Sequence, residues 1–110
     1  MVKVYTGRLW VADKDKLDIT VKSGDLTFAP TWDLVTKYKR GQYSEEEYIK
    51  HYYNLMRNSY KMNRGRWEEV LNMERVVFTC FCPSNGFCHR YLLKDIFIKL
   101  GATYGGEIDM

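Results

Sequence analysis

The residues with the richest chemistry in this chain lie together near its carboxyl end. Residues 79–90 read Thr-Cys-Phe-Cys-Pro-Ser-Asn-Gly-Phe-Cys-His-Arg, so three thiols, one imidazole and one guanidinium share one short segment. The apolar run Val76–Phe78 before the segment predicts a strand buried on both faces, and the apolar stripe from Leu92 to Leu100 after it predicts a helix. The segment therefore joins a strand to a helix whose first turn opens at Cys88.

The first chemistry that fits this turn is anion binding. A helix N-terminus offers unpaired N–H donors and a partial positive charge. Gly86 lets the backbone approach a ligand closely, and Arg90 can hold a phosphate or carboxylate with two hydrogen bonds. Lys22 can approach the same spot from a neighbouring strand end. In the plainer interpretation Arg90 pairs with a local acid such as Asp95 or faces solvent.

The second chemistry is that of a reactive thiol. A cysteine at a helix N-terminus beside His and Arg favours the thiolate form, and Cys88 meets this description best, with Cys82 next. We therefore take Cys88 and His89 as candidate catalytic residues. The plainer interpretation is that buried cysteines are small core residues, as we expect for Cys80 inside the strand.

The third chemistry is metal binding, because Cys80, Cys82, Cys88 and His89 are four soft or borderline ligands. Structural zinc sites usually use a C-x₂₋₄-C knuckle, and a C-x-C followed by an adjacent Cys-His departs from that spacing. The alternation of side chains along a strand also predicts that Cys80 and His89 face different surroundings. We therefore expect that the chain does not require a metal.

Composition sets the broad class of the protein. Hydrophobic residues make up 45% and charged residues 28% of 110 residues, which predicts one globular domain over residues 1–110. The net charge of +3 permits an anionic partner without requiring one. No apolar run is long enough to span a membrane, and the start reads as a strand rather than a signal peptide. With the cysteines confined to residues 80–88, we expect a reducing cytoplasm rather than a disulfide framework.

The periodicity of apolar residues predicts an α/β domain. Helix signals include the capping box from Ser44 to Glu47 and the C-terminal glycine Gly41. The tyrosine stripe of the helix after Ser44 is typical of a core face rather than a base-stacking platform. The expected strands are Val2–Ala12, Leu17–Lys22, Arg75–Cys80 and Thr103–Ile108. The expected helices are Thr31–Lys39, Glu45–Lys61, Arg66–Asn72 and His89–Leu100.

The final strand–helix–strand order favours parallel pairing. We predict a three-layer sandwich with a small, mostly parallel, Rossmann-like sheet. In such folds ligands bind beyond the carboxyl ends of the strands, where residues 22–24 and 80–88 are expected.

Several separate motifs carry a family resemblance that covers nearly the whole chain. They are Val4–Arg8, Leu17–Gly24, Phe28–Val35, Lys39–Tyr48, Val76–Phe78 with Cys80, Cys88–Arg90 and Gly106–Ile108. In this order they resemble the family catalogued as domain of unknown function 488. The resemblance implies an α/β fold and an intracellular bacterial, archaeal or viral setting, and it implies no particular reaction.

Two positions depart from the family pattern. Many members carry Asp-Val-Arg after the second strand, whereas this chain has Asp18-Ile19-Thr20, so we expect Lys22 to supply the missing positive charge beside Asp18. Many members also carry an acid where Cys82 stands. The resemblance therefore favours Cys88, His89 and Arg90 as the shared core of the site.

Two functions follow from these patterns. The leading one is binding of a phosphate-bearing ligand, a nucleotide or nucleic acid, with an enzymatic step by Cys88 or His89. The expected ligand-binding residues are Arg90, Lys22, Asp18, Cys82 and Gly86. The alternative is a non-catalytic interaction or adaptor domain in which the Cys-His-Arg turn is structural. Exposure of His89 and Arg90 in a pocket favours the first, and saturation of the same groups by Asp18 or another carboxylate favours the second.

Overall fold

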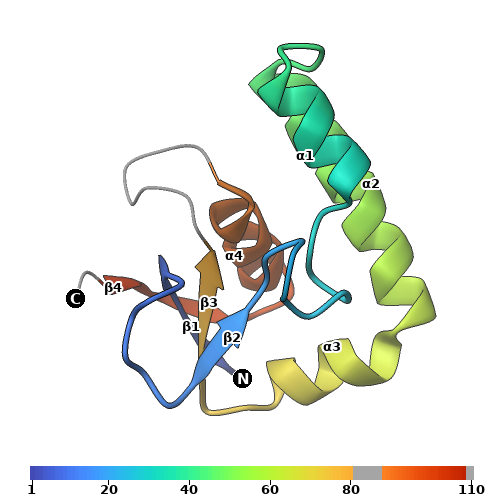
Figure 1. The fold of residues 1–110 in the computed structure, drawn as a ribbon. Coiled ribbons are helices and arrows are strands. Elements are labelled where there is room, and N and C mark those ends of the chain that lie inside the picture. The colour runs from blue at the N-terminus through green and yellow to red at the C-terminus, as the bar shows by residue number, and fades with distance from the viewer. Residues whose placement is uncertain (81–87, 109–110) are drawn as a thin grey trace.

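The computed structural model describes residues 1–80 and 88–108, and it confirms the α/β class. Four strands form one sheet in the order β2-β3-β1-β4, and each neighbouring pair is parallel (Figure 1). The strands are β1 Lys3–Arg8, β2 Lys16–Asp18, β3 Arg75–Cys80 and β4 Thr103–Ile108. The helices are α1 Trp32–Lys39, α2 Glu45–Met62, α3 Arg64–Leu71 and α4 His89–Lys99. The predicted site residues Cys82 and Gly86 lie outside the described residues.

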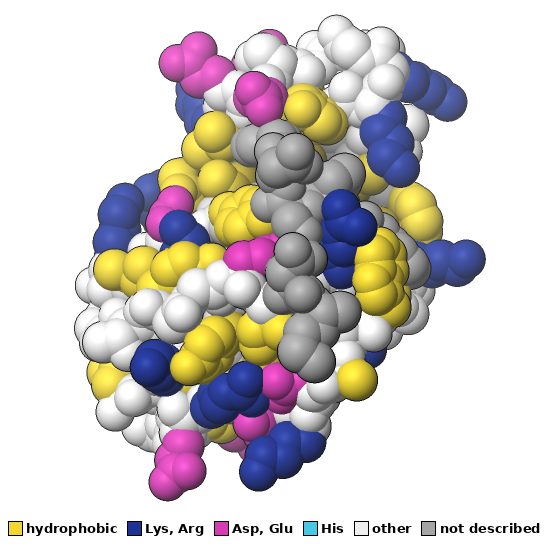
Figure 2. Space-filling view, turned by 90° about the vertical axis from the view of Figure 1, so that its left-hand side faces the viewer, with side chains coloured by type: hydrophobic (Ala, Val, Ile, Leu, Met, Phe, Trp, Pro, Cys, Tyr) yellow, Lys and Arg dark blue, Asp and Glu magenta, His cyan; other side chains and the backbone are white. Residues whose placement is uncertain are grey.

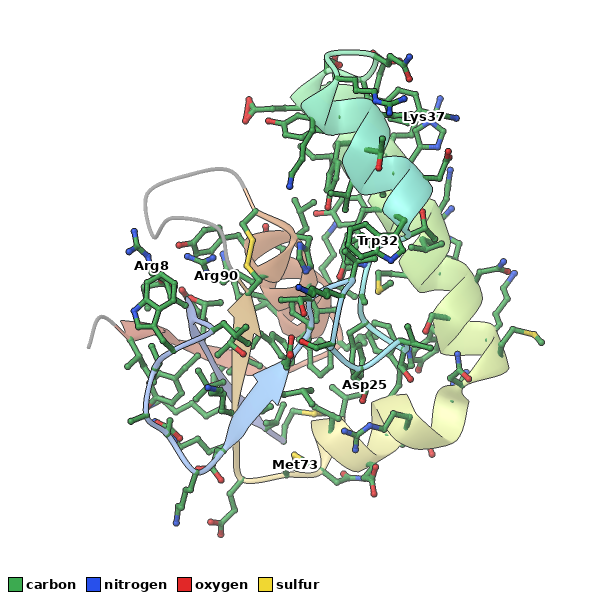
Figure 3. All side chains as sticks on the ribbon, viewed as in Figure 1. Arg8, Asp25, Trp32, Lys37, Met73 and Arg90 are labelled. Atoms are coloured by element: carbon green, nitrogen blue, oxygen red, sulfur yellow. A yellow bond between two sulfur atoms is a disulfide. The ribbon has the colours of Figure 1, made fainter. Side chains whose placement is uncertain are left out.

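The helices build the main core on one face of the sheet. Val4 of β1 and Phe78 of β3 belong to one buried cluster with side chains of all four helices. Rings from different elements meet there, as where Trp67 of α3 stacks on Phe97 of α4 with centroids 5.3 Å apart. The connection between β2 and α1 joins this layer through Asp25, which accepts a 2.9 Å hydrogen bond from Arg66 of α3 (Figure 3).

The opposite face of the sheet is covered by the connection 9–15, which runs from β1 to β2. A Cβ on Gly7 of β1 would lie 3.2 Å from the Val11 side chain, so the connection packs directly on the sheet. The path from β1 to β2 runs across the sheet against the direction of the other two crossovers. Connections of one hand that run in opposite directions lie on opposite faces. The third layer of the predicted sandwich is thus an extended connection and contains no helix.

Two strands are shorter than predicted. β1 ends at Arg8 rather than Ala12, because the chain turns after Arg8 to cross the sheet. β2 ends at Asp18 rather than Lys22, because the Asp18 carboxylate accepts hydrogen bonds from the Thr20 amide and the Ser23 hydroxyl. Such local bonds compete with the strand ladder and close a turn. Lys22 therefore lies in this turn and not at a strand end.

The structure confirms the predicted start and stop signals of α1 and α2. Thr31 accepts a hydrogen bond from the Leu34 amide, and Ser44 and Glu47 form both bonds of the capping box. Gly41, with φ of 77°, follows the C-cap of α1. It lets the chain reverse, so that α1 and α2 form a hairpin that projects beyond the sheet (Figure 1). Among the described residues, none of the helices is both long and apolar enough to cross a membrane.

Candidate functional site

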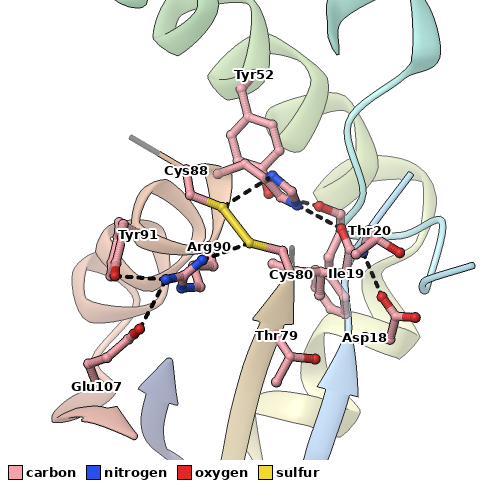
Figure 4. Close-up of a disulfide and its surroundings, with 12 residues drawn as sticks. Asp18, Ile19, Thr20, Tyr52, Thr79, Cys80, Cys88, Arg90, Tyr91 and Glu107 are labelled. Carbon is pink, nitrogen blue, oxygen red and sulfur yellow. Dashed lines mark hydrogen bonds and ion pairs between the residues drawn. A yellow bond between two sulfur atoms is a disulfide. The ribbon is translucent and has the colours of Figure 1, made fainter. Parts of the chain in front are cut away.

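The two cysteines that flank residues 81–87 meet at the carboxyl end of β3. Cys80 is the last residue of β3, and Cys88 is the extended N-cap of α4. Both are buried, and a disulfide joins them (Figure 4). Their Cα atoms lie 7.9 Å apart, wider than the roughly 4.4–6.8 Å that is usual for disulfides. The fold thus brings the strand and helix cysteines together.

The His89 ring is buried and held in one orientation. Its Nε2 lies 2.7 Å from the Ile19 carbonyl, which only accepts hydrogen bonds, so Nε2 carries the proton. Nδ1 is therefore unprotonated, and it lies 3.8 Å from Cys88 Sγ (Figure 4). Burial lowers the pKa of His89 to about 4, against the opposing effect of the Ile19 bond, so the ring is neutral at pH 7.

Arg90 is fully buried and ties α4 to two strand ends. Its Nη1 donates to Cys80 Sγ at 2.9 Å, and its Nη2 donates to Glu107 of β4 and to the Tyr91 hydroxyl, each at 2.9 Å. This is the carboxylate saturation that the structural interpretation anticipated, although the acid is Glu107 rather than Asp95. These contacts hold the start of α4 against the ends of β3 and β4, and anion binding by Arg90 stays a prediction.

Asp18 and Lys22 have different surroundings. Burial acts to raise the pKa of Asp18, but hydrogen bonds from Ser23 and Thr20 outweigh it and lower that pKa below its ordinary value. Asp18 thereby fixes the turn that presents the Ile19 carbonyl to His89. Lys22 is exposed in the same turn. Their roles in ligand binding stay predictions.

A mostly apolar pocket of about 190 Å³ opens beside His89. Its floor is formed by Thr20 and Val21 after β2 and by Cys80, Cys88 and His89. The opposite wall comes from Pro30 and from the α1–α2 hairpin, which supplies Val35, Tyr38, Lys39 and Tyr48. The rings of Tyr38 and Tyr48 meet edge to face at 5.2 Å. The pocket therefore lies between the hairpin and the carboxyl end of the sheet.

The sequence did not identify the hairpin residues as part of the site. Tyr48 belongs to the apolar stripe of α2. Because such a stripe normally marks a core face, the pattern gave no sign that Tyr48 also lines a pocket. The signal available was the resemblance, since Lys39–Tyr48 is one of the segments that carry it.

Comparison with protein families adds one decisive observation. The family model DUF488-N3a, described as the active DUF488-N3 subclade, matches residues 4–101. The chain belongs to the DUF488 family. The match covers the residues of both the floor and the opposite wall of the pocket in this DUF488 protein, from β1 through the end of α4. Neither the curated proteins nor the solved structures include a significant match.

One side of this DUF488 protein carries charges of both signs. On the side shown in Figure 2, basic and acidic side chains are interspersed over the described surface. The net charge of +3 agrees with this picture. Proteins that track long nucleic acids usually concentrate basic residues on one face.

Proposed function

We propose that this DUF488 protein binds a small phosphate-bearing ligand, a nucleotide, in the pocket between the α1–α2 hairpin and the sheet. Cys88 and His89, at the floor of that pocket, take part in a chemical step on the bound ligand. One observation carries the proposal: the pocket combines aromatic walls, a lysine and a cysteine–histidine floor.

The wall residues support a nucleotide over other anions. Tyr38 and Tyr48 offer aromatic surface, and aromatic rings stack on the faces of all nucleobases. Lys39 is exposed and lines the same pocket, so its ammonium can pair with a phosphate while the base lies deeper. The mixed surface charge favours a small ligand over a long nucleic acid.

The floor residues support a chemical step. His89 presents an unprotonated nitrogen in a fixed tautomer toward Cys88, and its other nitrogen is oriented by a backbone carbonyl. A reacting group that is oriented by a third group is typical of catalytic sites. We place the protein in a reducing cytoplasm, where Cys80 and Cys88 are thiols rather than a disulfide.

The alternative function is a non-catalytic interaction domain, and the surroundings of Arg90 favour it. A guanidinium that is fully buried against Glu107 and Cys80 stabilises a turn without any ligand. In that version Cys88 and His89 complete the same structural junction.

A panel of nucleotides, nucleosides and inorganic phosphate decides between the two functions. We expect calorimetric titration of the reduced protein to detect nucleotide binding. Lys39→Ala should lower the affinity for nucleotides about tenfold, the effect of losing about 1.4 kcal/mol, and leave the affinity for nucleosides unchanged. Tyr38→Ala should lower the affinity for both nucleotides and nucleosides. Lys99→Ala is the matched control, because Lys99 lines a different pocket beside Tyr53.

Failure of this proposal has a clear form. If no nucleotide or nucleoside binds at millimolar concentration, or if Lys39→Ala and Lys99→Ala weaken binding equally, the pocket is not a nucleotide site. The non-catalytic function would then stand.

A further inference from the structure

We propose that Cys80 Sγ, Cys88 Sγ and His89 Nδ1 bind one zinc ion, with the fourth coordination position directed into the pocket. The inference deepens the proposed function and rests on it for the ligand, because it names what acts at the pocket floor. It also revises the expectation drawn from the sequence that the chain requires no metal.

The convergence of three buried ligands is the first observation. The ligand atoms of Cys80, Cys88 and His89 all lie within 4.8 Å of one another. The sequence argument against zinc assumed that Cys80 and His89 face different surroundings, and the fold brings them together instead. The Ile19 carbonyl after β2 orients the His89 ring, and this contact between distant residues cannot be predicted from the spacing of ligands along the chain.

The backbone spacing is the second observation. The Cα atoms of Cys80 and Cys88 lie 7.9 Å apart, wider than the roughly 4.4–6.8 Å of most disulfides. Two thiolates on one tetrahedral zinc, each about 2.3 Å from the ion, have sulfurs about 3.8 Å apart. The wider backbone separation leaves room for an ion between the reduced sulfurs.

The orientation of His89 is the third observation. A histidine that ligates a metal usually donates its other N–H to a carboxylate or a backbone carbonyl, which fixes the tautomer. His89 does this through Nε2 at 2.7 Å from the Ile19 carbonyl, and its Nδ1 lies on the side of Cys88. The ligand nitrogen is thus already selected by the protein.

Charge balance supports the same site. A thiol reductant first converts the disulfide to two thiols and is itself oxidised to a disulfide. Zinc then displaces the two thiol protons to solvent, and two thiolates neutralise the divalent ion. Arg90 donates to Cys80 Sγ at 2.9 Å and is itself balanced by Glu107 at 2.9 Å. A buried site with this arrangement carries little net charge.

The pocket provides the fourth position. Cys80, Cys88 and His89 all line it, so an ion held by them faces the space assigned to the nucleotide. Three protein ligands and one exchangeable position are typical of catalytic zinc, which activates a water or polarises a bound oxygen. Two cysteines and one histidine form one of the known ligand sets of such centres.

Metal analysis and cobalt substitution test the inference on the intact chain. Protein purified under reducing conditions without chelator should contain about one zinc per chain. Replacing zinc by Co²⁺ should produce the absorption bands of tetrahedral thiolate coordination, and azide should shift them by entering the exchangeable position. Cys80→Ser, Cys88→Ser and His89→Gln should each abolish stoichiometric uptake. His51→Gln is the matched control and should retain the ion. Cys82→Ser tests whether Cys82 takes the fourth position, and it should retain the ion as well.

Each outcome has a defined meaning. The cobalt spectrum of the unmodified protein needs no variant, so a variant that fails to fold does not obscure the result. No stoichiometric zinc or cobalt in the reduced protein would refute the site. Loss of metal in Cys82→Ser, or no response to azide, would refute the exchangeable position. Nucleotide titration of metal-free protein is measured separately, so a protein that binds nucleotide but takes up no metal would refute this inference and leave the proposed function standing.

Discussion

His89 keeps one tautomer because the Ile19 carbonyl is held by the turn after β2. The Asp25 amide donates to the Asp18 carbonyl at 2.8 Å, and the Gly24 amide donates to the Thr20 carbonyl at 2.9 Å. At the scale of single residues, therefore, the orientation of a buried imidazole depends on backbone packing several residues away. Gly24 is the tightest point of this turn.

Substitution of Gly24 should disturb the turn and the site together. A Cβ at Gly24 would lie 2.4 Å from the Thr20 nitrogen and 2.5 Å from the Thr20 oxygen, and a backbone cannot yield as a flexible side chain does. We expect Gly24→Ala to lower the free energy of unfolding by about 1–3 kcal/mol. Urea denaturation measures this. Gly65→Ala, in α3 with no atom within 4 Å of the new Cβ, should instead be stabilising by about 0.5–1 kcal/mol. Equal effects of the two substitutions would contradict the argument.

Single residues of the site differed in how far the sequence predicted them. Cys88 and His89 were placed at the start of a helix by pattern alone, and they lie there. The partner of Arg90 was not predictable, because Glu107 comes from β4, which reaches the site only through the sheet order β3-β1-β4. Contacts of this kind depend on topology rather than on spacing along the chain.

At the scale of elements, the connection 9–15 covers the face of the sheet on which a three-layer sandwich would carry a helix. Arg75 of β3 donates to Asp13 at 2.7 and 2.8 Å and to Asp15 at 2.9 Å, and its guanidinium lies 4.6 Å from the ring centroid of Tyr5. These contacts anchor the connection across the sheet. They replace the apolar stripe with which a helix would cover that face.

The anchor predicts a pH dependence of stability. The hydrogen bond from Arg75 lowers the pKa of Asp13 to about 2, below that of an unfolded carboxyl. A carboxyl with a depressed pKa contributes stability above its unfolded pKa of about 4, and this contribution is lost as the pH falls toward 2. Because the pair is partly exposed, we expect Asp13→Asn to cost only about 1 kcal/mol at neutral pH.

Chemical denaturation of both proteins from neutral pH to about pH 3 checks this prediction. The difference between wild type and Asp13→Asn should shrink below about pH 4. Asp33→Asn is the control, because Asp33 pairs with Lys37 on the exposed surface of α1. A difference that stays constant with pH would show that the Arg75 bond does not depend on the charge of Asp13.

The elements themselves were predicted best where local chemistry determines their ends. The capping box starts α2 at Glu45 as expected, since both of its hydrogen bonds form within four residues. β2 was predicted too long, because Thr20, Ser23 and Asp18 satisfy one another locally and the alternating pattern does not show this. The covering of the second face by 9–15 follows from strand order, which the sequence pattern did not contain.

At the scale of the whole molecule, the pocket lies between two parts that differ in how deeply they are buried. Its floor belongs to the sheet and α4, where β3 is buried along nearly its whole length. Its wall belongs to the α1–α2 hairpin, which projects from the sheet (Figure 1). Of the eight residues of α1, Leu34 alone is buried. Elements with few buried apolar contacts open more readily than core strands.

Ligand binding should therefore slow the exchange of backbone amides in α1. In the free protein we expect amides of α1 to exchange faster than those of β3, because the hairpin is less buried. A nucleotide between Tyr38 and the floor would contact both parts and hold the hairpin against the sheet, so protection should rise in α1 and in the first half of α2. Hydrogen exchange with and without the tightest nucleotide of the panel measures this, with β4 as the internal control because it lies across the sheet from the hairpin. Saturating nucleotide that leaves α1 exchange unchanged would place the ligand outside this pocket.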